Sequence, residues 1–160
     1  MLISNRIRNR ELFFNLAGNN LSELTQVKDL EIIYTSQLSF TPHISSIISK
    51  AKQHCFLLRK SFTCSNSTAL ILAFKTYVLA ILDYCSPVWS PSLVTDILRI
   101  ESVQSSFTRC LMCCKGLQYK DRLSICNLIT LEKRRILADL ILFYKIVHKL
   151  ILTDLGDSFK

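Results

Sequence analysis

The feature that most constrains the fold is a change of hydrophobic period at Thr41. From there to about residue 152, apolar side chains recur at steps of three and four residues, the period of one face of an α-helix. Thr41-Pro42 is typical of a helix start, with a capping hydroxyl before a proline in the first turn. The apolar stripe of this first helix comprises Ile44, Ile47, Ile48, Ala51, Cys55, Leu58 and Phe62.

Further helical stretches follow the first. Residues 67–84 are predicted to form a helix that ends before two prolines, because a residue that precedes proline avoids helical conformations. A third helix is expected over about 92–114, with Gly116 as its C-terminal cap, and a short one over 120–127. Thr130 is predicted to cap the last helix, which runs to about residue 152. Its stripe comprises Leu137, Ile141, Tyr144, Val147 and Ile151.

Residues 12–40 have the character of short strands. Leu12–Leu16 and Leu21–Leu24 flank a Gly-Asn-rich turn, which predicts a hairpin, and Leu30–Tyr34 is β-branched and aromatic enough for a third strand. The expected protein is therefore mainly α, a bundle of about four to five helices preceded by a short hairpin or three-strand lead-in. The predicted organisation is a β lead-in over 1–40, a helical domain over 41–152 and a frayed tail over 153–160.

The positive charge is concentrated in one part of the chain. Of 160 residues, 20 are Lys or Arg and 12 are Asp or Glu, yet residues 41–80 contain five cations and no acid. The candidate nucleic-acid-binding residues are Lys50, Lys52, Arg59 and Lys60. They fall off the apolar stripe, so the first helix can pack on a core and still present them to a polyanion. A solvated basic face that aids solubility is the alternative reading.

The seven cysteines indicate reduced thiols rather than a disulfide framework. Their number is odd and no secretory signal is recognisable at the start, so an intracellular location, cytoplasm or nucleus, is expected. Cys110, Cys113 and Cys114 share one face of the predicted third helix, but zinc usually takes a second ligand pair and Cys126 stands alone. We therefore expect small buried apolar side chains here, with no metal and no other cofactor.

Membrane insertion and catalysis find little support in the sequence. The most apolar stretch, 68–82, is shorter than the roughly 20 residues of a membrane span and has Lys75 at its centre, so no membrane partner is expected. No Walker loop or paired-carboxylate arrangement is recognisable, and the three histidines lie in separate predicted helices. The chain as it stands is not expected to be an enzyme.

Four segments taken in order are more specific than any of these patterns. They are Lys28-Asp29-Leu30 with 37–44, Leu82–Trp89, Tyr119–Leu123, and 131–135 with 138–140 and 144–146. In this order and spacing they resemble the region after the catalytic core in reverse transcriptases of non-LTR retrotransposons, of the jockey and CR1 type. The resemblance covers about residues 12–151. It implies that 12–40 correspond to the last strands of the palm and 41–151 to the helical thumb, which grips the template–primer duplex.

The resemblance also implies what this sequence lacks. The family's metal-binding aspartates lie upstream of Lys28-Asp29-Leu30, and the aromatic-x-Asp-Asp motif that carries them is absent here. The expectation is a fragment of an RNA-directed DNA polymerase without its catalytic aspartates, with a residual role in binding RNA or RNA–DNA duplex. Relatives usually have glycine where Glu31 stands, which affects the local turn. The alternative is a helical protein–protein interaction module, or self-association through exposed apolar surface, without nucleic-acid binding.

Two groups of charged residues are expected to have structural roles. Arg122 is expected to pair with Asp83 or Glu132. The cations 133–135 open the last helix, where they oppose the positive end of its dipole, and we expect ion pairing there with acids such as Glu132 and Asp139.

Overall fold

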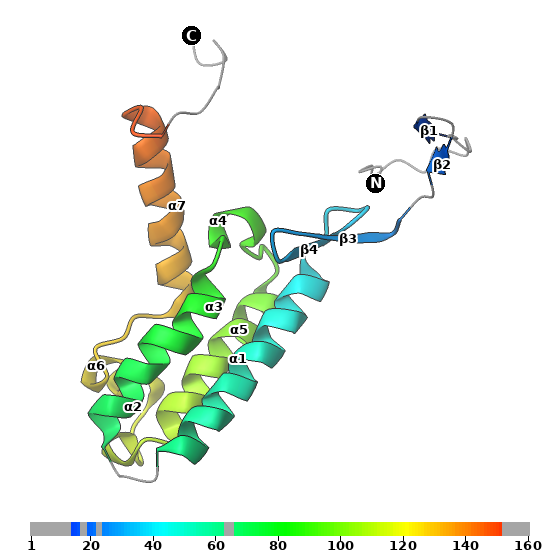
Figure 1. Cartoon of the computed structure of the whole chain (residues 1–160). Helices are drawn as coiled ribbons and strands as arrows, with labels where there is room; N and C mark the ends of the chain where they lie inside the picture. Colours follow the sequence, from blue (N-terminus) through cyan, green and yellow to red (C-terminus); the bar gives the residue numbers. More distant parts are fainter. Residues whose placement is uncertain (1–13, 17–18, 22–23, 63–65, 152–160) are drawn as a thin grey trace. The chain divides into compact units, whose positions relative to one another are not determined.

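The computed structural model describes residues 14–16, 19–21, 24–62 and 66–151 (Figure 1). It divides into two compact units, Met1–Ile47 and Ile48–Lys160, with the boundary inside the first helix. The protein is mainly α with a short β lead-in, which confirms the predicted fold class. The predicted frayed tail, 153–160, lies outside the described residues.

The first hairpin is formed by β1 (Phe14–Leu16) and β2 (Asn19–Leu21). The strands are antiparallel, with Phe14 opposite Leu21. The hairpin confirms the prediction, except that Asn19 and Asn20 belong to the second strand rather than to the turn.

The second hairpin is formed by β3 (Gln26–Asp29) and β4 (Ile32–Thr35), with Asp29 opposite Ile32. The predicted strand over 30–34 is wrong at its start, because Leu30 and Glu31 form the turn with φ of 45° and 66°. Two positive φ angles in succession are the geometry of a type I′ turn, whose twist matches that of the flanking strands. Strand β3 escaped prediction because most of its side chains are exposed, so it carries no apolar alternation.

Helix α1 (Thr41–Ser61) begins where the period of the sequence changes. Its predicted stripe is buried at Ile44, Ile47, Ile48, Ala51 and Cys55. Leu58 is only half-buried, and Phe62 is exposed just beyond the end of the helix. Within the first unit, the backbone N–H of Ile33 in β4 donates to Nδ1 of the buried His43 at 3.4 Å, which ties the second hairpin to the start of α1.

The predicted helix over 67–84 is a continuous rod of three parts. These are α2 (Ser67–Ala73), a π-helical turn (Phe74–Val78) and α3 (Leu79–Asp83). The side chain of Asn66 caps the rod by accepting hydrogen bonds from the N–H groups of Thr68 and Ala69 at 3.1 and 3.2 Å. The ring of the buried Phe74 stacks on that of Phe107, with 4.2 Å between centroids, so the rod packs against α5.

The remaining helices are α4 (Ser86–Trp89), α5 (Val94–Arg109), α6 (Tyr119–Ile125) and α7 (Leu131–Val147). Trp89 is fully buried, and its indole N–H donates to the carbonyl oxygen of Tyr84 at 2.7 Å. Around it the second unit has an apolar core to which α5 contributes Ile100, Val103 and Phe107. None of the helices in the described ranges is long and apolar enough to cross a membrane.

The predicted third helix over 92–114 is too long at both ends. Helix α5 stops at Arg109, Leu111 is extended with ψ of 135°, and Met112–Cys114 is a 3-10 turn. The side chains of Leu111 and Cys114, which follow the end of α5, are both buried. Gly116, with φ of 74°, therefore follows the 3-10 turn and does not cap α5.

The stripe predicted for the last helix is not buried. Leu137, Ile141, Tyr144 and Val147 are all exposed, and the buried residues of α7 are Leu131 and Arg135 in its first turns.

Candidate nucleic-acid interface on α1

All four predicted cations of α1 are exposed, but they do not share one side of the helix. Lys52 and Arg59 are seven residues apart, so they lie on the same side, about 10 Å apart along the axis. Lys50 and Lys60 lie at other angles around the helix. The structure therefore brings together two of the four predicted residues.

Lys52 and Arg59 line a hollow between α1 and α5 with a volume of about 210 Å³. Its other lining residues are Cys55, Phe56, Val103, Ser106 and Phe107. The Nη1 atom of Arg59 lies 3.5 Å from Sγ of Cys110, just after α5, which directs the guanidinium toward that helix end. The hollow thus combines two cations with an apolar floor.

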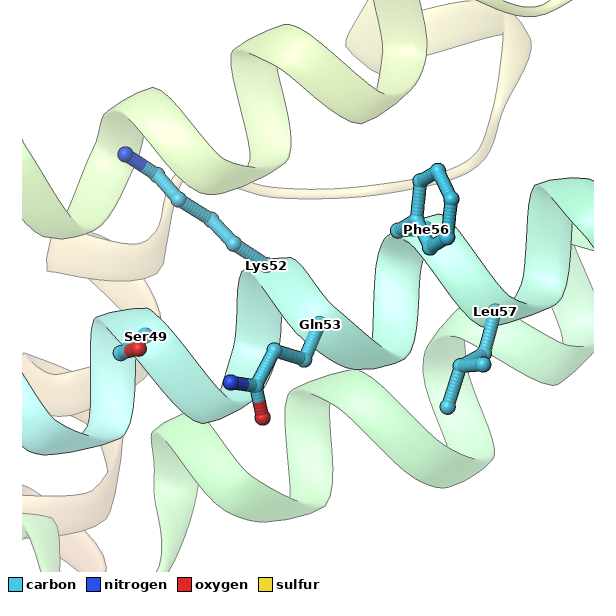
Figure 2. A pocket seen from close by; sticks show the side chains of 5 residues that line it. All are labelled: Ser49, Lys52, Gln53, Phe56 and Leu57. Atoms are coloured by element: carbon cyan, nitrogen blue, oxygen red, sulfur yellow. The ribbon is translucent and has the colours of Figure 1, made fainter.

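A shallower depression of about 540 Å³ covers the outward surface of α1 (Figure 2). In this view Lys52 and Phe56 point to one side of the helix, and Gln53 and Leu57 point to the other. Phe56 is 59% exposed and Leu57 is 55% exposed. Sequence reasoning missed both residues, although their off-stripe positions between cations were a visible signal.

The charge on α1 is unusual because its 21 residues include no acid. Arg59 and Lys60 stand in the last turn, where cations interact favourably with the negative end of the helix dipole. They have a stabilising role inside the protein whether or not a ligand binds. Lys52 has no such role from the dipole, since it stands in the middle of the helix.

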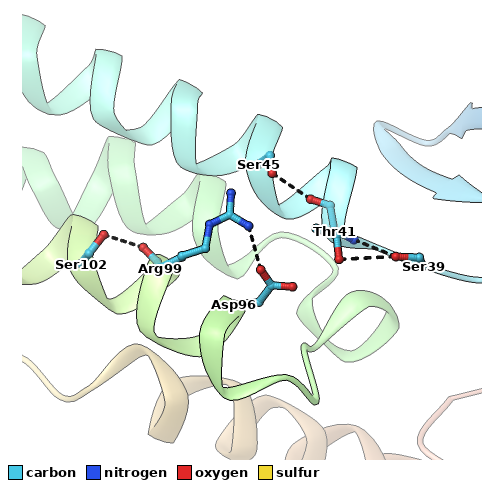
Figure 3. A network of polar contacts seen from close by, with 6 residues as sticks. All are labelled: Ser39, Thr41, Ser45, Asp96, Arg99 and Ser102. Carbon is cyan, nitrogen blue, oxygen red and sulfur yellow. Dashed lines mark hydrogen bonds and ion pairs between the residues drawn. The ribbon is translucent and has the colours of Figure 1, made fainter.

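Local polar networks hold the starts of the long helices (Figure 3). In the first unit, the N–H of Thr41 donates to Oγ of Ser39 at 3.4 Å, so Ser39 provides the capping oxygen that the sequence assigned to Thr41. In the second unit, the buried Asp96 accepts a hydrogen bond from Nη1 of Arg99 at 2.8 Å. The negative charge of Asp96 is therefore balanced by Arg99 of the same helix.

The expected partners of Arg122 are wrong. Arg122 is buried and donates to the carbonyl oxygen of Leu117 (2.9 Å), the hydroxyl of Ser105 (3.2 Å) and the hydroxyl of Thr108 (3.3 Å). Its guanidinium carbon also lies 5.4 Å from the ring centre of Tyr119. Arg122 therefore stabilises the packing of α6 against α5 through hydrogen bonds to uncharged oxygen atoms.

The partner of Asp83 is Arg134 at the start of α7. Nε of Arg134 donates to both carboxylate oxygens at 3.2 and 3.0 Å, and Nη2 makes a further short contact with Oδ2. Ion pairing in the basic cluster 133–135 is confirmed, although the acid comes from α3. Burial lowers the pKa of the neighbouring Arg135. This cluster anchors α7 and does not add to the surface of α1.

The cysteines are arranged differently from the expectation. Cys110 and Cys113 are exposed, while Cys114 and Cys126 are buried with their sulfur atoms 3.5 Å apart, so Cys126 does not stand alone. Burial raises the pKa of the Cys114 thiol to about 12, which keeps it protonated and unreactive at neutral pH. No group of three or more His, Cys, Asp or Glu side chains in the described part of the chain could hold a metal ion.

Comparisons with protein-family models, with curated proteins and with solved structures find no match to this chain.

Proposed function

We propose that the chain is the palm end and thumb of a non-LTR retrotransposon-type reverse transcriptase, and that α1 contacts the backbone of an RNA or RNA–DNA duplex. The ordered segments that resemble this family support the proposal. The observation that carries it is the placement of Lys52 and Arg59 on one side of an acid-free helix, with the exposed Phe56 between them in sequence.

The two cations are far enough apart to contact different phosphates of one strand, since about 10 Å along α1 separates them. Lys50 and Lys60 add to the positive field without sharing that side. Phe56 offers a ring face on which a base or ribose can pack, the combination common in single-strand and duplex-end binding. Phosphate contacts position a nucleic acid without reading its sequence, so the proposed binding is sequence-independent and salt-dependent.

Polymerisation is not part of the proposed activity of this chain. The printed sequence has no two adjacent aspartates, whereas the family holds its metal ions on such a pair. Incorporation of nucleotides by the purified chain on a primed RNA template would contradict this part of the proposal.

The test is fluorescence anisotropy with a short RNA–DNA hybrid over a series of salt concentrations. The variant Lys52→Gln/Arg59→Gln should weaken binding about tenfold or more at 0.1 M salt and reduce the slope of log K against log salt by about two. The matched control is Lys115→Gln/Lys120→Gln, which removes the same charge from exposed positions off α1. Equal losses in the two variants would reject α1 as the interface, and no binding by the unchanged chain would reject the function.

A second candidate is the helical interaction module, because apolar side chains are exposed along most of α7. A chain that assembles into a discrete oligomer and has no affinity for the hybrid would favour it.

A further inference from the structure

Only the first turns of α7 are held by the rest of the second unit. Leu131 and Arg135 are buried and Arg134 pairs with Asp83, whereas no residue from 136 to 151 is buried. In Figure 1 the later part of α7, in orange and red, projects beyond the other helices of its unit. Its large exposed apolar residues are Ile136, Leu137, Leu140, Ile141, Leu142, Phe143, Tyr144 and Val147. An apolar surface of this extent marks an interaction site.

One subset of these residues has the spacing of a coiled-coil seam. Ile136, Leu140, Phe143 and Val147 follow one another at steps of four, three and four residues. Their exposed fractions are 51%, 57%, 66% and 57%, so the whole seam faces solvent. The seam continues backward to Lys133, three residues before Ile136.

We propose that two copies of this chain dimerise by pairing these seams, Ile136 to Val147, in antiparallel orientation. The area is sufficient for a stable pair. Together with the flanking Leu137 and Tyr144, which are also about half exposed, the four seam residues present on the order of 500–600 Å² per copy. Two copies that cover this surface bury about 1,000–1,200 Å², the lower end of the range of specific interfaces.

The charges along the seam select the orientation. In a parallel pair, Lys133 would face Lys133 of the second copy across the seam, and like charges repel there. In an antiparallel pair, Lys133 lies beyond Val147 of the second copy, at the open end of the seam. Its aliphatic stem can then pack while the ammonium group reaches water. In this register Leu140 opposes Phe143 of the second copy, and Ile136 opposes Val147. The inference does not depend on nucleic-acid binding.

Sedimentation equilibrium of the full chain tests the pairing. The unchanged chain should dimerise with a dissociation constant on the order of micromolar to tens of micromolar. Leu140→Glu/Val147→Glu should raise that constant at least about 100-fold, since two carboxylates per copy enter an apolar seam. The control Leu72→Glu/Leu98→Glu changes equally exposed leucines on α2 and α5 and should leave the dimer intact. Circular dichroism of each variant verifies that the helices remain, and Phe143→Glu provides a second seam variant if the double one unfolds.

A mixing experiment tests the orientation. Leu140→Lys and Phe143→Glu should each fail to dimerise alone but should form a mixed dimer together, because position 140 of one copy opposes position 143 of the other. A parallel pair would not bring these charges together, so failure to form the mixed dimer would overturn the antiparallel arrangement. An unchanged chain that stays monomeric at about 200 μM would overturn the proposal. So would a monomer that floats with phosphatidylcholine vesicles, which would assign the seam to a lipid surface.

Discussion

Replacing Arg122 by methionine should strongly destabilise the second unit. Methionine keeps most of the aliphatic bulk of arginine but removes the planar guanidinium, which donates to Leu117, Ser105 and Thr108 from a buried position. The hydroxyl of Thr108 retains its own bond to the carbonyl of Gln104 at 3.0 Å. The carbonyl of Leu117 loses the 2.9 Å donor that the arginine gives it.

The size of the effect follows from these bonds. A hydrogen bond with a charged partner contributes about 1.5–3 kcal/mol, but bonds from one group are not additive. The substitution also removes the cost of keeping a cation out of water, which offsets part of the loss. A net decrease of about 2–4 kcal/mol in the free energy of unfolding is expected. For a domain of roughly 100 residues this lowers Tm by about 10–20 °C.

Thermal unfolding followed by circular dichroism measures this change. Arg109→Met is the matched control, because Arg109 is exposed in the last turn of α5 and its loss should change stability by less than about 0.5 kcal/mol. Arg122→Lys should recover only part of the stability, since an ammonium group cannot reproduce the planar fork of donors. If Arg122→Met melted within about 2 °C of the unchanged chain, the reasoning that the buried guanidinium joins α6 to α5 would be refuted.

Two further predictions concern the turn of the second hairpin and the buried thiols. Leu30→Asn/Glu31→Gly should slow amide exchange in β4, because left-handed backbone costs about 1–2 kcal/mol per ordinary residue and both new residues accept it more readily. This gain exceeds the loss of the exposed ion pair between Lys28 and Glu31. Faster exchange in β4 would contradict the prediction. Burial raises the pKa of Cys55 to about 11 and that of Cys114 to about 12, whereas thiols in the unfolded chain ionise near 9.0. Between pH 9 and 11 these two thiols therefore lose their protons only in the unfolded chain, which favours unfolding. Stability to urea should therefore fall as the pH rises through that window, with a shallower fall in Cys114→Ala, and an identical pH profile for that variant would argue against the thiol as the cause.

Much of the fold and part of the candidate site could be predicted from local patterns. The change of period at Thr41, the helical rod from Ser67 and the hairpin of β1 and β2 depend on neighbours within a few residues, so the sequence predicts them directly. The exposure of the cations of α1 followed in the same way from their positions off the apolar stripe. The nucleic-acid role of those cations stays a prediction.

Other features depend on groups that are distant in the sequence. Asp83 pairs with Arg134 rather than with Arg122 because the start of α7 lies against the end of α3. The hollow lined by Lys52 and Arg59 exists because α5 forms its second wall. The thiols of Cys114 and Cys126 come into contact because α5 ends at Arg109, earlier than the sequence predicted.

The sequence by itself determined which residues of α7 are apolar. It thereby indicated that the segment forms an amphipathic or wholly apolar helix. It could not determine that Leu137 and Ile141 face solvent while Arg135 is buried. Helical periodicity reports the positions of apolar side chains around an axis, but burial depends on whether another element lies against them. The tertiary structure places the rest of the second unit only against the first turns of α7, so the apolar side chains beyond those turns are exposed.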